Sequence, residues 1–501
     1  MFSLATGNQT ESFHHLKRIL LLINITVTNA GMQVSIHSGS SVTAKLHRSK
    51  DHITVFDNSH AHAERCGDRR AGTASRVVII VNRPASHHDY KPSPINGQIR
   101  TKREELDMRL RIVFLSLAAA LVALPAAAAS TVKIGFVTTL TTPAGAMGRD
   151  MVEAANIALD HIGHKMGGKD VEFIVEDDGF KPEIGKQKTD KLVKQDDVHF
   201  VTGYIWSHVL LASRKSALDA GKFLISANAG PSLLAGKLCH KNFFSSSWQN
   251  DQNPMATGEV LNAKGVKKLY IMSPNYAAGK NMVSGVQRTF KGEIVGKDMT
   301  KWGKDMQLDF SAELAKAKAS GADAIFVFYP GPAGPAFIKQ YQQAGLRGVI
   351  PLYTVFTVDA LSLGRLQKAK LGGVLGSWNT MFWAPDLDNA TNKRFVADFK
   401  AKTGRSPTHY AAQSYDAIML IKSGVDAVDG NMDDQDGIRA AMMKADFPSV
   451  RGKFRYGPNH FPIQNFYLRT VKEDAAGDWF VSHVSTVLTD HQDSYHDQCN
   501  L

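Results

Sequence analysis

The chain has 501 residues, of which 43% are hydrophobic and 21% are charged, and its formal net charge is +12. These proportions are those of ordinary globular material, and the length suggests about three domains. The positive charge is spread over stretches of mixed sign and is raised by a basic leader, without a dense basic helix carrying interleaved aromatic residues. The composition therefore argues against nucleic-acid binding.

A segment inside the chain, at residues 108–129, has the features of a secretory signal peptide. Arg109 and Arg111 form a short basic start, Ile112 to Leu124 is apolar, and four alanines follow at 126–129. The apolar stretch is short for a membrane span, although a buried helix or a membrane anchor stays an alternative. We predict export to the periplasm and a mature protein that begins near Ser130.

Residues 1–107 are predicted to be a non-native or disordered extension. A signal peptide is recognised at an N-terminus, so Met108 is the expected start of translation. The upstream apolar runs, Ile19–Ile25 and Arg76–Val81, are isolated and lack sustained periodicity. A metal cluster of His60, His62 and Cys66 is a weak alternative, because its spacing does not follow the rules for zinc sites.

Two cysteines, Cys239 and Cys499, remain in the predicted mature segment. A single pair in an exported protein favours one disulfide, which would tie the C-terminus to a loop that follows a strand. Two unrelated buried thiols are the alternative.

From residue 131 the chain alternates short β-branched runs with longer amphipathic runs, which indicates parallel sheets with helices on both faces. The expected strands of a first unit are Val132–Val137, Val171–Glu176, Val198–Gly203 and Phe223–Ser226, with helices at Gly148–Ile162, Pro182–Lys194 and Ser207–Ala220.

The alternation restarts after the polar stretch Trp248–Pro254, which suits a crossing between two lobes. The expected strands of the second unit are Lys267–Met272, Glu293–Met299, Asp323–Phe328 and Ile350–Tyr353, with helices at Met282–Phe290, Ser311–Ala319 and Ala333–Ala344. Helices then follow at Asn389–Thr403, Tyr410–Val428 and Gln435–Lys444, and strands near Val450–Tyr456, Gln464–Val471 and Asp478–Leu488.

This order predicts an α/β clamshell, with two doubly wound parallel-sheet lobes joined by a hinge of several crossings. The first lobe is expected at 130–251 plus about 380–448. The second is expected at 252–379 plus about 449–488, with a C-terminal tail at 489–501.

Motifs of catalysis and of cofactor binding do not emerge from the sequence. The run from Gly163 to Lys169 nearly matches a phosphate-binding loop, but Asp170 stands where a Ser or Thr must hold magnesium. No G-x-G-x-x-G, G-x-S-x-G, C-x-x-C or H-E-x-x-H is present. We expect no cofactor, no metal and no catalytic residue.

Small polar and aromatic residues follow the predicted strands, where sheets of this kind bind ligands. Ser207 and the segment Asn228–Gly230 follow two strands of the first unit, where helix N-termini attract carboxylates, although Ser207 would serve equally as a helix cap. Tyr276 and Tyr329 follow strands of the second unit and suit either a ligand wall or the core.

The mature segment resembles the periplasmic solute-binding proteins of branched-chain amino acid type that serve ATP-binding-cassette importers. The resemblance covers about residues 131–471 and implies the type I clamshell fold of that family. It rests on Val132–Gly135, Gly145–Gly148, Phe200–Gly203, Ile225–Ala229 and, most specifically, Tyr410–Ala417.

The resemblance also implies a site. Ser207, with Trp206 beside it, and the amides of Asn228, Ala229 and Gly230 would hold a ligand carboxylate, although Gly230 stands where the family has a Thr. Tyr276 and Tyr329 would cover the ligand, and Thr357 lies at a further strand end. The family's Glu that pairs with the ligand ammonium is missing after Tyr353, where only Asp359 is near.

Without that Glu, a carboxylate that lacks an amine becomes as good a candidate as a branched-chain amino acid. Trp206, Phe356 and Phe382 could stack on an aromatic acid, and some subfamilies bind benzoate-like acids. Both ligand classes stay open. The expected partner is an inner-membrane permease, and the protein is expected to be a monomer. A ligand-sensing regulator of the same fold and an enzyme are the competing functions.

Overall fold

The computed structural model describes residues 131–475 and 477–501, and before them only the backbone of a few short strands. These strands are β1 (Leu22–Thr28), β2 (Gly31–His37), β3 (Ala44–Arg48), β4 (Ile53–Asp57) and β5 (Val78–Ile79). β1 pairs with β2, and β4 pairs with β3 and β5, all antiparallel, which the sequence had not led us to expect. The predicted signal peptide and His60, His62 and Cys66 lie outside the described residues.

The first sheet is parallel apart from one short hairpin. In spatial order its strands are β11 (Phe243–Ser245), β10 (Phe223–Ser226), β9 (Phe200–Gly203), β6 (Val132–Thr138), β8 (Lys169–Asp177) and β7 (Lys165–Met166). The chain passes from β6 to β8 on one side and then to β9 on the other, which creates a topological switch point at the carboxyl end of β6.

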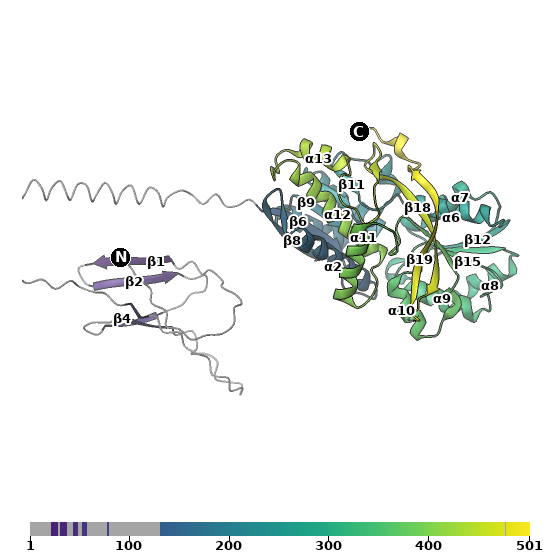
Figure 1. Ribbon diagram of the computed structural model, residues 1–501, viewed down its shortest axis with the longest axis horizontal. Helices are drawn as coiled ribbons and strands as arrows, with labels where there is room; N and C mark the ends of the chain where they lie inside the picture. The colour runs from purple at the N-terminus through teal and green to yellow at the C-terminus, as the bar shows by residue number, and fades with distance from the viewer. Residues whose placement is uncertain are drawn as a thin grey trace, which may run out of the picture. The chain divides into compact units, whose positions relative to one another are not determined.

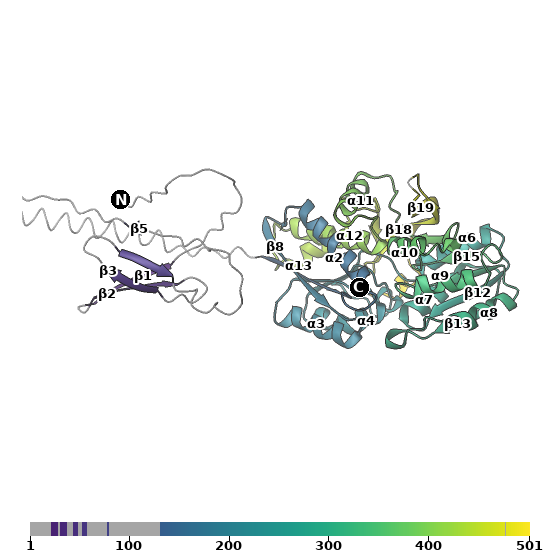
Figure 2. The ribbon, with the colours of Figure 1, turned by 90° about the horizontal axis from the view of Figure 1, so that it is seen from below.

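Helices cover both faces of this sheet (Figures 1 and 2). They are α2 (Gly145–His161), α3 (Pro182–Lys194), α4 (Ser207–Leu218) and the short α5 (Ser232–Ala235). α2 begins three residues before the predicted start at Gly148, because glycines let its first turn approach the preceding loop. A Cβ at Gly148 would lie 1.9 Å from the carbonyl oxygen of Thr139.

The second sheet repeats this plan. In spatial order it contains β13 (Glu293–Thr300), β12 (Lys268–Pro274), β14 (Ala324–Val327), β15 (Leu352–Thr354), β16 (Trp378–Met381), β18 (Pro462–Glu473) and β17 (Arg455–Tyr456), and β19 (Trp479–His491) also pairs with β18. The strands from β13 to β16 are parallel, and the pairs made by β18 are antiparallel. A second switch point lies at β12, between β13 and β14.

The helices of this part include two that the sequence analysis did not predict, α6 and α10. The elements are α6 (Gln252–Ala263), α7 (Ala277–Thr289), α8 (Ser311–Ala319), α9 (Ala333–Gln343) and α10 (Ala360–Lys368), with 3₁₀ turns at Gly303–Asp305 and Gly372–Val374. α6 begins with buried polar residues, and the Asn253 carbonyl accepts a 2.7 Å bond from Thr380. Polar residues on the buried side removed the periodicity that would have revealed this helix.

After β16 the chain returns to the first sheet. α11 (Ala390–Thr403), α12 (His409–Asp426) and α13 (Gln435–Met443) follow, and α11 and α12 pack against α2. The chain then enters the second sheet again through β17, β18 and β19 (Figure 1). The predicted α/β architecture of two parallel-sheet lobes is confirmed. Within the described residues, no helix is long and apolar enough to cross a membrane.

The C-terminus is fixed to the loop that follows α5. Cys239, which follows α5, forms a disulfide with Cys499, and their Cα atoms are 5.7 Å apart. Beyond β19, the Tyr495 hydroxyl donates a 2.9 Å bond to the buried Asp251. β19 extends to His491, so residues 489–491 of the predicted C-terminal tail belong to this strand.

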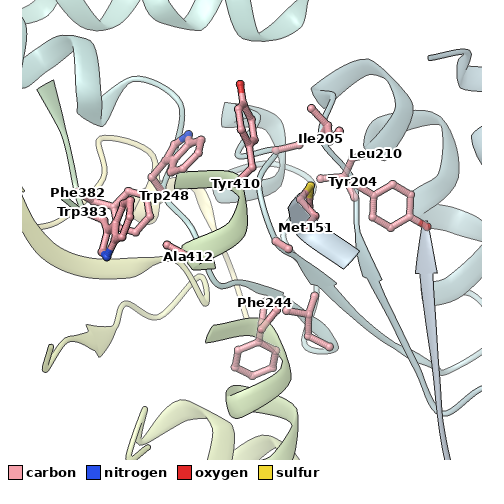
Figure 3. Close-up of a cluster of buried hydrophobic side chains, with 14 of the residues drawn as sticks. Met151, Tyr204, Ile205, Leu210, Phe244, Trp248, Phe382, Trp383, Tyr410 and Ala412 are labelled. Carbon is pink, nitrogen blue, oxygen red and sulfur yellow. The ribbon is translucent and has the colours of Figure 1, made fainter. Parts of the chain in front are cut away.

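A continuous apolar core connects the first sheet with the junction of the two lobes. Figure 3 shows Trp248, Phe382 and Trp383 gathered near Tyr410, with Ile205 and Tyr204 beyond them. A second apolar cluster, which includes Tyr329 and Phe337, fills the space beneath α8, α9 and α10. The junction is therefore packed with aromatic side chains, and the ligand pocket described next is lined by several of them.

Candidate ligand-binding site

A pocket of about 290 Å³ lies where the carboxyl ends of the two sheets meet, and we call it the front pocket. Its walls come from the segments that follow β9, β10, β12, β14 and β15, so it lies beside both switch points. The lining residues are Ile205, Trp206, Ser207, Asn228, Ala229, Trp248, Asn250, Tyr276, Ala278, Met282, Phe328, Pro330, Phe356 and Tyr410.

The polar side of the front pocket is the N-terminus of α4. Ser207 is the first residue of this helix, and its Oγ accepts a 3.1 Å bond from Nδ2 of Asn250, which leaves the hydroxyl proton able to donate. Among the described residues, no acceptor serves the backbone N–H groups of Ser207 and His208. Unpaired N–H groups at a helix N-terminus favour an anion.

Trp206 forms one wall of the front pocket and is held by hydrogen bonds on the side away from the pocket. Nε1 of Trp206 donates a 2.8 Å bond to Thr139, whose hydroxyl donates to Asp178. The indole also packs against Phe180, with ring centroids 4.5 Å apart, and against Trp302 at 5.8 Å. Trp206 is thus fixed from behind and presents an aromatic surface to the pocket.

The opposite wall comes from the second sheet. The Tyr276 ring stacks on Trp302 at 5.1 Å with an interplanar angle of 14°. Deeper in the junction, Trp248 stacks on Phe356 at 4.7 Å with an angle of 27°. The pocket therefore offers flat apolar surfaces on several sides, and flat surfaces of this kind favour a planar apolar ligand body.

The front pocket carries no acidic or basic side chain among its lining residues. Burial raises the pKa of the Tyr276 hydroxyl above its ordinary value, so this group stays neutral. Behind the walls, burial raises the pKa of Asp178 to about 6 and lowers the pKa of His208 to about 4. Near neutral pH the pocket holds no ionised side chain, and the α4 N-terminus is its source of positive potential.

The structure brings five of the predicted site residues to the front pocket: Trp206, Ser207, Asn228, Ala229 and Tyr276. Tyr329 and Thr357 lie elsewhere. Tyr329 is 1% exposed and packs on Phe310 in the second core, and the Thr357 hydroxyl accepts from the Tyr329 backbone N–H at 2.9 Å. Side chains alternate along a strand and its extension, so Phe328 faces the pocket and its neighbour does not.

The amides predicted after β10 are mostly occupied inside the protein. The N–H of Ala229 donates to the carbonyl of Tyr204 at 3.1 Å, and the N–H of Gly230 donates to Asn250 at 3.2 Å. Gly230 does not line the pocket. A Cβ there would lie 2.0 Å from the Trp248 carbonyl oxygen, which explains why a Thr does not fit at this position.

The sequence analysis missed several residues of the front pocket, above all Asn250, Trp248 and Tyr410. Asn250 and Trp248 lie in the polar stretch that we interpreted as a crossing, and Tyr410 opens α12 in the family motif. Phe356 reaches the pocket as a predicted stacking residue, whereas Phe382 packs behind Trp248 at 5.3 Å. In the described part of the chain, no group of three or more His, Cys, Asp or Glu could hold a metal ion.

Asp359, the nearest acidic residue to the missing ammonium partner, does not reach the front pocket. Its carboxylate accepts a 2.8 Å bond from the N–H of Ser362 and caps α10. A ligand ammonium in the front pocket would therefore find no carboxylate among the lining residues.

Comparison with known proteins identifies the family of the chain. The model of the periplasmic binding protein family matches residues 131–477. Leu/Ile/Val-binding protein homolog 6 of Brucella melitensis is 25% identical over 390 residues, which cover 75% of this chain and 96% of that protein.

Solved structures give the same result. A solute-binding protein of an ABC transporter from R. palustris, in complex with benzoate, is 30% identical with a TM-score of 0.68, covering 74% of this chain and 100% of that one. A branched-chain amino acid binding protein from Streptococcus pneumoniae, in complex with isoleucine, is 23% identical with a TM-score of 0.62, covering 71% of this chain and 100% of that one, and shares the fold. The chain belongs to the periplasmic binding protein family.

Proposed function

We propose that the front pocket binds an aromatic monocarboxylic acid of the benzoate type. The observation that carries this proposal is the combination of an α4 N-terminus suited to a carboxylate with aromatic walls and no acidic side chain. The carboxylate would accept from the Ser207 hydroxyl and the unpaired N–H groups of α4. The ring would lie between Trp206 and Tyr276.

An α-amino acid fits this pocket less well. Its ammonium group would be buried without a carboxylate partner, which costs several kcal/mol. A benzoate-type acid brings only the one charge that α4 can stabilise. The benzoate complex of the R. palustris protein supports this choice, since that chain is 30% identical over its whole length.

The wider role follows from the family. The chain is a solute-binding protein, and we infer that it hands its ligand to the permease of an inner-membrane ABC importer without chemical turnover. We also infer that it works in the periplasm and that residues 108–129 direct its export. N-terminal sequencing of the exported protein should then begin close to Ser130, and an exported form that retains residues 1–107 contradicts this inference.

Calorimetry with three matched ligands tests the choice of ligand. We expect benzoate to bind, benzamide to bind at least tenfold more weakly because it lacks the charge, and leucine to bind more weakly still. Benzamide keeps the ring and the shape, so the comparison isolates the carboxylate. Leucine binding tighter than benzoate contradicts the proposal and restores the amino acid as the ligand.

A further inference from the structure

A second, larger cavity of about 940 Å³ lies beside the front pocket, and we call it the rear cavity. His409 in its wall packs on Phe356 of the front pocket, with ring centroids 4.9 Å apart. The walls of the rear cavity come from α10, from β18 and β19 with their turn, and from the segment that joins α11 to α12. The two cavities share no lining residue.

The wall of the rear cavity contains a buried guanidinium group without an ionic partner. Arg469, on β18, is 3% exposed and donates to the Asn379 side chain at 2.7 Å and to the Trp383 carbonyl at 2.8 Å. Both acceptors are neutral, and among the described residues no carboxylate lies within salt-bridge distance of Arg469, although Asp386 and Asp359 attract its charge from farther away. Burial lowers the pKa of Arg469 to about 9, which still leaves it charged at neutral pH.

The other charged groups on the wall are already engaged or lie at the edge. Arg405 pairs with Asp150, and Asp359 caps α10. The Asp474 carboxylate accepts from the N–H of Asp478 in the turn between β18 and β19. Asp359 and Asp386 act on the Arg469 charge only through longer-range attraction, so this buried guanidinium has no direct ionic partner. A ligand anion in contact with it would supply that partner and offset part of the cost of burying the charge.

A second unpartnered polar atom lies in the same wall. His409 is 2% exposed, and its Nε2 has no hydrogen-bond partner among the described residues. Trp383 lines the cavity as well and adds an indole to its wall. An anion with an apolar body matches this combination of a cation, a free ring nitrogen and an indole.

We propose that the rear cavity is a second binding site, which takes a small aromatic carboxylate whose charged end is bound by Arg469. This proposal does not depend on the ligand of the front pocket. The site differs from the front pocket in its chemistry, because a guanidinium group binds the anion here and a helix N-terminus binds it there.

Equilibrium dialysis of the full chain with benzoate, and with benzamide as the uncharged control, tests the proposal by counting bound molecules. We expect two benzoate sites in the parent. Gly364→Trp should remove one of them, because Gly364 lines the cavity and a Cβ there meets no heavy atom within 4 Å, so the indole can fill the space. Gly364→Ala, the matched control, should keep both sites.

Arg469→Met should weaken the rear site by about ten- to a hundredfold, the usual loss of a hydrogen bond to a charged group. If this variant does not fold, Gly364→Trp decides alone. A benzoate count that Gly364→Trp leaves unchanged overturns the proposal. A single parental site that Gly364→Trp removes supports the rear cavity and counts instead against benzoate in the front pocket.

Discussion

Ser207 is a predicted ligand-binding residue that lies on the polar side of the front pocket. Its hydroxyl lies at the start of α4, accepts from Asn250 and keeps its proton for a ligand. Ser207→Ala should therefore weaken benzoate binding by about ten- to a hundredfold, since one hydrogen bond to a charged group is lost. Calorimetry gives the affinity. Ser311→Ala, at the first position of α8 and outside the pocket, is the control and should bind like the parent.

The raised pKa of the buried Asp178 predicts that the stability of the protein depends on pH. Burial raises the pKa of its carboxyl group from 3.8 to about 6, and its Oδ2 atom has no partner among the described residues. Between these two pH values the folded protein holds a proton that the unfolded chain has released, so the free energy of unfolding falls as pH rises. Above about pH 6 the carboxylate is charged and the loss of stability, about 3 kcal/mol at most, is complete.

Asp178→Asn should accordingly stabilise the protein at pH 7.5 by about 1–3 kcal/mol and change it little at pH 4. Urea unfolding at both pH values measures the difference. Asp177→Asn is the control and should destabilise the protein at pH 7.5. Although burial opposes the charge of Asp177, hydrogen bonds that include those from Leu140 and Thr141 outweigh burial and lower its pKa. A stability gain that is equal at both pH values contradicts the argument.

Some of the residues predicted for the site line the front pocket and others do not, and the reason lies in how each side chain is oriented where its strand ends. Ser207 and Tyr276, which the resemblance to the family predicted as ligand-binding residues, both line the front pocket, because both follow strands at the switch points. The resemblance predicted Tyr329 where Phe328 lines the pocket, since the orientation of a side chain just beyond a strand changes with a shift of one residue.

At the scale of elements, most helices of the two lobes were predicted from the alternation of strand-like and helix-like runs, and α6 and α10 were among those missed. The helices α3 and α11 were found nearly at their observed bounds. α10 was missed, although the equally short α8 and α13 were predicted and although Asp359 and Ser362 form a capping box that marks its start. Asp359, which was predicted as the acidic residue nearest a ligand ammonium, caps this helix instead.

The disulfide gives a prediction at this scale. It links residues 260 positions apart and holds the segment after β19 against α5. Cys499→Ser should lower the free energy of unfolding by up to about 5 kcal/mol in the chain-entropy model. Urea unfolding with and without a reductant checks this: the reductant should destabilise the parent and leave a Cys239→Ser/Cys499→Ser protein unchanged. A parent that does not respond to full reduction contradicts the prediction.

At the scale of the whole molecule, the two sheets repeat one topology, and their switch points supply the two walls of one pocket. This much follows from the alternation of strands and helices, and the fold was predicted correctly for that reason. The three passages of the chain between the sheets were harder to predict in detail, because buried polar residues such as Gln252 and Asn253 hide helix periodicity there.

Aromatic contacts between the lobes predict how fast a ligand leaves. Trp302, beyond β13, stacks on Tyr276 and also contacts Phe180 and Trp206 of the first lobe. Each such pair contributes about 0.5–1.5 kcal/mol, so Trp302→Ala should speed benzoate release by roughly tenfold and change association little. Stopped-flow measurements give both rates. Trp378→Ala, on β16 and outside the pocket, is the control, and equal acceleration in both variants contradicts the assignment.

The absence of ionisable side chains other than tyrosine from the front pocket's lining has a consequence for proton exchange. Burial raises the pKa of Tyr276 and of Tyr410, so neither loses its proton near neutrality. Capture of an anion there takes up no proton and releases none, and its affinity has no slope against pH once Asp178 is ionised. A change in pH above the pKa of Asp178 would therefore leave the fraction of ligand-bound protein unchanged, and ligand concentration alone determines that fraction.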